Sequence, residues 1–171
     1  MPPIPKHEAL RILSEEHREV SALVERLRPG DQTCGGLGGG EWSPKDLLGH
    51  LSSWEEHALA AIDAWAGGKT APIDRALRAE GLHAVNRRAV AQREERPLAR
   101  VRAEFEEIHS SLVEAIEGTS PGVWDAPPTR RSRRSLGERV GAILGGAGGG
   151  FHHAAAHLPD LRTFVDERSA G

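Results

Sequence analysis

The chain has 171 residues, of which 38% are hydrophobic and 27% charged, and its formal net charge is -3. This length and composition fit one folded domain with its own core and exclude a disordered chain. The single cysteine, Cys34, excludes an internal disulfide framework. We find neither a signal-peptide pattern nor a run of about 20 apolar residues, and therefore expect a cytoplasmic protein with no membrane partner. The slight negative net charge predicts no nucleic-acid partner.

Apolar residues recur three or four positions apart in several segments, and this spacing predicts amphipathic helices. The first such segment stops at Pro29. The second starts at Ser43-Pro44, where Ser43 is a typical N-cap and Asp46 can complete a capping box, and it ends at Gly67. A weaker helical segment is expected at residues 75–93.

The third principal helix is expected between Pro97 and Gly118, followed by a loop over 119–134. After a short helix near 136–144, the last principal helix is expected over about 151–167, where Pro159 should kink or restart it.

The sequence thus predicts an all-α four-helix bundle with antiparallel principal helices, in a single domain over residues 1–171. The residues expected in its core are Leu13, Val20, Leu47, Trp54, Phe105, Ile108 and Phe164.

The nine histidines supply the candidate metal ligands. His153 and His157 are four residues apart, so a helix would place both imidazoles on one face, a standard way to offer two metal nitrogens. That face also carries Leu161 and Phe164, and it should therefore point inward. His152 would lie about 100° away around the helix.

His50 is the best candidate for a third ligand, because it lies at the edge of the apolar stripe of its helix. His17 is the reserve candidate, and His57 could support the ligands from an outer position. Trp54 could form an apolar wall for a substrate, although a core position is the stronger interpretation. Asp46 and Asp160 could orient imidazoles, but helix capping is the favoured role for Asp46.

Three other features suggest no chemistry. The glycine-rich stretches at 34–40 and 145–150 match no phosphate-binding pattern and follow no strand, so they are interpreted as loops. The arginines at 130, 131, 133 and 134 could attract phosphates or carboxylates, but a solvated loop is favoured. Cys34 has no histidine near it in the sequence, which speaks against a catalytic thiol.

Three segments resemble the DinB-like four-helix bundles. The segment EWSPKDLLGHLSSWEEH looks like the helix that bears one metal histidine, and FHHAAAHLPDLRTFV looks like the matching last helix. Between them, LHAVNRRAVAQREERPLARVRAEFEEIHSSL is similar to the middle region of these proteins. The resemblance implies a divalent metal, often zinc or nickel, bound by His50, His153 and His157, with open positions for water or substrate.

Relatives of this kind include mycothiol- or bacillithiol-dependent enzymes and small self-resistance proteins. We therefore expect a metal-dependent thiol transferase or hydrolase that acts on a small electrophilic molecule. The alternatives are a non-catalytic protein that binds a small molecule for self-resistance, and a structural bundle with an empty site. By analogy, a homodimer is also expected.

Overall fold

The computed structural model of the chain describes residues 3–127 and 132–171, and this part is all-α, as the sequence predicts. This part of the chain contains no strand, and an isolated β-bridge joins Gly146 and Gly149. No helix in this part of the chain is long and apolar enough to cross a membrane. The helices are α1 (Lys6–Glu25), α2 (Pro29–Gln32), the 3-10 helix η1 (Leu37–Gly39), α3 (Pro44–Ala66), α4 (Pro72–Glu80), α5 (Leu82–Ala91), α6 (Leu98–Gly118), α7 (Pro121–Trp124), α8 (Leu136–Ile143) and α9 (Leu158–Ser169).

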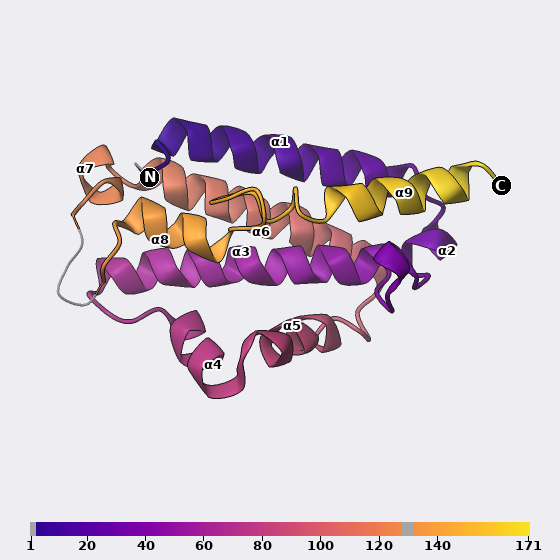
Figure 1. The fold of residues 1–171 in the computed structure, drawn as a ribbon, viewed down its shortest axis with the longest axis horizontal. Helices are drawn as coiled ribbons and strands as arrows, with labels where there is room; N and C mark the ends of the chain where they lie inside the picture. The colour runs from indigo at the N-terminus through magenta and orange to yellow at the C-terminus, as the bar shows by residue number, and fades with distance from the viewer. Residues whose placement is uncertain (1–2, 128–131) are drawn as a thin grey trace.

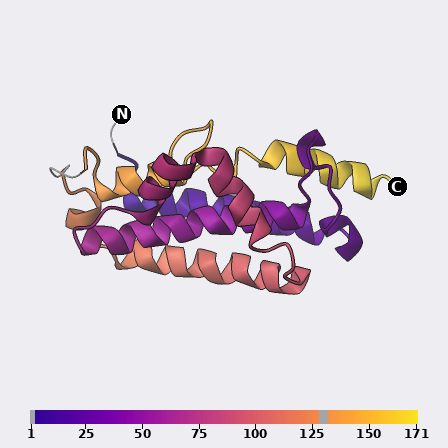
Figure 2. The ribbon, with the colours of Figure 1, turned by 90° about the horizontal axis from the view of Figure 1, so that it is seen from below.

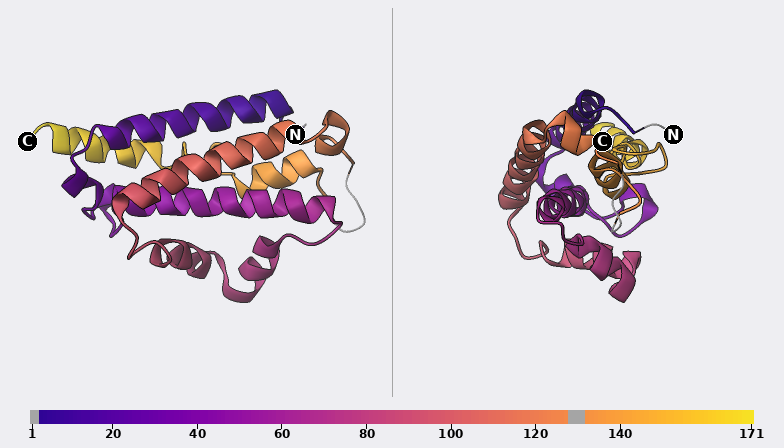
Figure 3. Two further views of the ribbon diagram at one scale, coloured as in Figure 1. Left: turned by 180° about the vertical axis from the view of Figure 1, so that it is seen from behind. Right: turned by 90° about the vertical axis from the view of Figure 1, so that its left-hand side faces the viewer.

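Three long helices and one composite rod form the bundle. The helices α1, α3 and α6 are long, while α8 and α9 lie end to end and together take the place of a fourth helix (Figure 1). Two of the four run in one direction and two in the other: α1 and the α8–α9 rod oppose α3 and α6 (Figure 1). The end-on view in Figure 3 shows these four around a common axis, with α4 and α5 outside them.

The start of α3 follows the predicted capping pattern, and this fixes the helix that carries His50. The Ser43 hydroxyl accepts a hydrogen bond from the Asp46 backbone N–H at 3.2 Å, and the Asp46 carboxylate accepts one from the Ser43 N–H at 2.8 Å. Two otherwise unpaired donors of the first turn are satisfied in this way. Helix capping is therefore the observed role of Asp46.

The connection between α3 and α6 is a long crossover built from α4 and α5, which lie over α3 (Figure 2). The single helical segment expected at 75–93 is two helices. Gly81 separates them with a φ of 79°, in the left-handed region that a side chain disfavours. The crossover places α5 beside α3 at the level of Trp54, whose indole N–H donates to the Asn86 side chain at 3.1 Å.

The last helix differs from the prediction. It begins at Leu158, and the residues from Phe151 to His157 form successive turns. Pro159 lies in the first turn of α9, where its missing N–H costs no hydrogen bond. The helix therefore restarts at the proline, and residues 151–157 are free to follow an irregular path.

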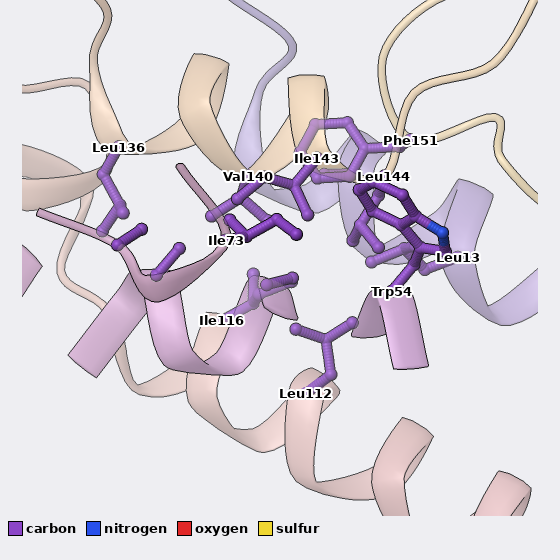
Figure 4. Close-up of a cluster of buried hydrophobic side chains, with 14 of the residues drawn as sticks. Leu13, Trp54, Ile73, Leu112, Ile116, Leu136, Val140, Ile143, Leu144 and Phe151 are labelled. Carbon is purple, nitrogen blue, oxygen red and sulfur yellow. The ribbon is translucent and has the colours of Figure 1, made fainter. Parts of the chain in front are cut away.

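The core consists of two clusters of buried side chains, one on each side of the His50 region. The cluster shown in Figure 4 joins α8 to α3 and α6, and it also contains Trp54 and Phe151. The second cluster joins the end of α1 to α9 and the start of α3. Six of the seven predicted core residues are buried, and Ile108 is only partly buried. The inward face of α6 is rotated from the predicted one, so that His109 is buried beside Phe105.

The loop expected at 119–134 contains the short helix α7, and Trp124 at its end is fully buried. Its indole stacks on Phe151 with the ring centroids 6.0 Å apart. Of the arginine cluster predicted in this loop, Arg130 and Arg131 lie outside the described residues.

Candidate metal centre

Three histidines that are distant in sequence meet between α3 and the segment before α9. One ring nitrogen from each of His50, His153 and His157 lies within 4.8 Å of the other two. The Nε2 atoms of His50 and His153 are 3.0 Å apart. The rings meet edge to face, with interplanar angles between 71° and 80°, so their nitrogens can point to a shared centre. The structure thus brings together the three residues that the sequence singled out.

The irregular segment that carries two of these histidines is held by both of its neighbours. On the α8 side, the His153 N–H donates to the Leu144 carbonyl at 3.0 Å. On the α1 side, the Glu16 carboxylate accepts hydrogen bonds from His152 Nδ1 at 2.6 Å and from the Ala155 N–H at 2.9 Å. These bonds fix the turns without a helix, and they direct the ring of His152 to Glu16.

Burial keeps the three imidazoles neutral. Burial, together with the nearby His153 and His157, lowers the pKa of His50 to about 3. Burial and the neighbouring His157 lower the pKa of His153 to about 4. Burial also lowers the pKa of His157, although Asp160 opposes this effect. Neutral imidazoles present lone pairs, and that is the state in which histidine binds a metal.

The donor set fits a divalent metal. Zinc–nitrogen bonds of about 2.0–2.1 Å place two ligand nitrogens at most about 4 Å apart, so the three rings need to move only slightly. His50 is 3% exposed and its Nδ1 atom has no hydrogen-bond partner among the described residues. Its Nε2 atom lies within hydrogen-bond distance of the His153 Nε2 atom, and a divalent cation bound here would take the place of the proton that the two rings share. His153 and His157 are only partly buried, which leaves a route from solvent to the centre.

Two tryptophans flank the centre. Trp42 lies 4.8 Å from the ring of His50, and Trp54 lies 5.8 Å from the ring of His153, between centroids. Trp54 is buried in the core, with its ring near Leu13 and Phe151 (Figure 4). The small cavity that His153 lines has a volume of about 20 Å³, and Trp54 is not among its lining residues.

A second group of ligand-type side chains lies between three helices, and the sequence pattern did not predict it. His17 from α1, Glu55 from α3 and His109 from α6 have ligand atoms within 4.8 Å of one another. The rings of His17 and His109 are stacked, 3.7 Å apart and tilted by only 12°. Lone pairs lie in the plane of each ring, so two parallel stacked rings cannot both point at one ion. His109 instead donates to Glu55 at 3.0 Å.

His17, the reserve ligand, is therefore engaged elsewhere: its Nε2 atom lies 2.9 Å from a Glu106 carboxylate oxygen. The signal that could have identified this cluster is the position of His109, four residues after Phe105 and three before Leu112 on α6. His57 packs edge-on against Trp54 at 5.5 Å. Among the described residues, neither Asp46 nor Asp160 hydrogen-bonds to a ring of the three histidines.

The chain is thus a helical bundle in which three imidazoles converge. The model of the DinB superfamily matches residues 12–158, and the chain belongs to this superfamily. The comparison with curated protein sequences gives no match.

Two solved structures share the fold. The crystal structure of an uncharacterised protein from Escherichia coli UTI89 is 15% identical, with a TM-score of 0.82, and the match covers 98% of this chain and 96% of that one. The colibactin self-resistance protein ClbS, in complex with a dsDNA, is 18% identical with a TM-score of 0.72, and the match covers 99% and 98%.

The second neighbour corrects one prediction. The net charge of the chain led us to exclude nucleic acid as a partner, and this exclusion is wrong, since a protein of the same fold is found in complex with a dsDNA. The physical reason is that net charge averages over the whole surface, whereas binding depends on the local arrangement of basic groups.

Proposed function

We propose that His50, His153 and His157 hold one divalent metal ion, zinc or nickel, and that the protein uses it on a small electrophilic molecule. The observation that carries this proposal is the convergence of three neutral imidazole nitrogens within 4.8 Å. We also propose that residues 1–171 act as one domain.

A divalent metal held by three neutral ligands would supply Lewis-acid activation at its open positions. The chain's own residues position the three histidines and shield them. Glu16 orders the segment with His153 and His157, and the buried His50 anchors it to α3. Trp42 and Trp54 exclude water from the His50 side, and Trp54 could offer an apolar wall to a substrate. A low-molecular-weight thiol such as mycothiol or bacillithiol is the proposed co-substrate, and thiol transfer or hydrolysis is the proposed reaction.

The alternative is self-resistance by binding, without turnover. It is supported by the likeness to ClbS, which is a colibactin self-resistance protein. In this case the same site would sequester a small reactive molecule, and loss of that molecule from solution would stop at one equivalent per protein chain. A structural bundle with an empty site remains the third hypothesis.

The test begins with elemental analysis of protein purified without a histidine tag. About one zinc or nickel per chain supports the metal site, while less than about a tenth contradicts it. A screen of thiols with small electrophiles then follows substrate loss over time. Substrate loss beyond one equivalent per chain, which stops when the metal is chelated and resumes when the metal is added back, identifies an enzyme. Loss of one equivalent identifies a sequestering protein.

Nucleic acid is a second candidate partner, which the dsDNA complex of ClbS favours. Fluorescence anisotropy with a labelled duplex, measured at several salt concentrations, tests it directly. Specific binding would persist at about 150 mM salt, whereas loss of binding below that concentration would indicate only general charge attraction.

A further inference from the structure

A basic cavity lies far from the three histidines, at the other end of α3. Its volume is about 390 Å³, and it is lined by the end of α3, by α4 and by the segment 132–134 that leads into α8. From His50 to Ala61 in its wall is about 16 Å along α3, at 1.5 Å per residue. The cavity is therefore a separate site from the proposed metal centre.

The walls of this cavity are strongly positive although the chain as a whole is negative. They carry five basic side chains and one acidic one, a formal net charge of +4 in a chain whose net charge is -3. The basic residues are Lys69, Arg78, Arg133, Arg134 and Arg139. The acidic one is Asp74, and it pairs with Arg139.

The remaining four basic side chains are not neutralised. Within the described part of the chain, Lys69, Arg78, Arg133 and Arg134 form no ion pair, whereas most other arginines of the chain lie beside a carboxylate. Positive groups gathered around a hollow raise the local concentration of anions. Guanidinium groups also match the oxygen geometry of phosphate with paired hydrogen bonds.

The size and the lining of the cavity indicate the kind of anion. Its volume falls within the range of about 300–1,000 Å³ that is typical of small-molecule sites. Trp65, half-buried in the wall, adds an aromatic surface beside the arginines. A duplex carries its phosphates along the outside of a wide rod, with about one charge per 1.7 Å of its axis. A hollow of this size suits a compact ligand better.

We propose that this cavity binds a small molecule with several adjacent phosphate groups, of the di- or triphosphate class. The four unpaired basic groups would neutralise its three or four negative charges, and Asp74 would hold Arg139 in the wall. The site goes beyond the proposed metal function and does not depend on it.

The test is calorimetric titration of the whole protein with inorganic tripolyphosphate at about 150 mM salt. We expect saturable binding of one ligand per chain. Arg133→Ala/Arg134→Ala should weaken it at least tenfold, and Lys69→Ala/Arg78→Ala, which alters the part of the lining from α4 and the segment before it, should do the same. Arg28→Ala/Arg87→Ala removes two exposed arginines outside the cavity and should change the affinity less than twofold. The four altered cavity residues are exposed and form no ion pair with any residue that the structure describes, so their removal should leave the fold and the metal content intact.

Three results would overturn the proposal. One is no saturable binding up to about 1 mM tripolyphosphate, and another is equal weakening in the control and cavity variants. The third is binding of a labelled duplex at the cavity, shown by loss of duplex binding in both cavity variants. In this result tripolyphosphate also fails to displace the duplex. Metal content is measured on the same samples, so a failure here is distinguished from a failure of the metal site.

Discussion

His152 Nδ1 lies 2.6 Å from a carboxylate oxygen of Glu16, and this contact decides which histidines of the last segment can share a centre. His152 and His153 are neighbours in the chain, yet their rings have different partners. The ring of His153 meets His50, with 3.0 Å between the Nε2 atoms, while His152 is paired with a carboxylate from α1.

The first prediction separates these two neighbours. Replacing His153 by alanine should reduce the bound metal to less than about a tenth of the wild-type content, because two imidazoles remain where three are needed for tight binding. His152→Ala should keep most of the metal. The exposed His83 on α5 provides a further control, and His83→Ala should match the wild type. Metal content per chain is measured by elemental analysis of the untagged proteins. Equal metal in His153→Ala and wild type would remove His153 from the site.

The second prediction concerns Glu16 as a positioning residue. Its carboxylate holds both His152 and the Ala155 backbone, so Glu16→Ala should loosen the turns that present His153 and His157. We expect the zinc affinity to fall about 10- to 100-fold, the usual effect of losing a group that orients a ligand. Competition with a chelator measures this. Glu19→Ala, on the same helix and paired with the exposed Arg162, should leave the affinity unchanged. An equal loss in both variants would mean that Glu16 acts only through general stability.

The third prediction concerns pH. Because the pKa values of His50 and His153 lie near 3 and 4, and that of His157 is also lowered, few protons compete with a metal at pH 6. Three ordinary histidines with a pKa of 6.5 would lose roughly 50-fold in affinity between pH 7.5 and 6.0. Here the loss should be less than about fourfold, the loss that a single ordinary histidine would cause. Affinity should fall steeply only as the pH approaches about 4. Chelator competition at a series of pH values checks this, and a 50-fold loss by pH 6 would contradict the neutral state of the buried rings.

The fourth prediction concerns the contact between α8 and Trp124. A methyl group at Gly137 would lie 2.6 Å from the indole nitrogen of Trp124, which is fully buried. Gly137→Ala should therefore lower the free energy of unfolding by about 1–3 kcal/mol, as overpacking of a core does. At Gly122 a methyl group would meet no described atom within 4 Å, so Gly122→Ala serves as the matched control. Urea unfolding followed by circular dichroism gives both values. A Gly137→Ala protein as stable as the control would show that the indole can move aside.

The long helices and the N-terminal cap of α3 could be predicted from the sequence. The spacing of apolar residues identified α1, α3 and α6, and the pair Ser43 and Asp46 located the start of α3. These features depend on contacts within a few residues, which a sequence pattern records directly. The choice of His50, His153 and His157 also came from the sequence, through spacing and a family resemblance. That they bind a metal remains a proposal.

The way in which these histidines meet follows from the tertiary structure alone. His153 and His157 do not share a helical face, because α9 begins only at Leu158, with Pro159 in its first turn. The turns before it are shaped by Glu16 from α1, about 140 residues earlier in the chain. The stacked pair of His17 and His109 and the basic cavity around Arg78 and Arg133 were likewise beyond the sequence pattern. Each depends on side chains from separate helices, and their distances follow from how the whole bundle packs, which no local pattern encodes.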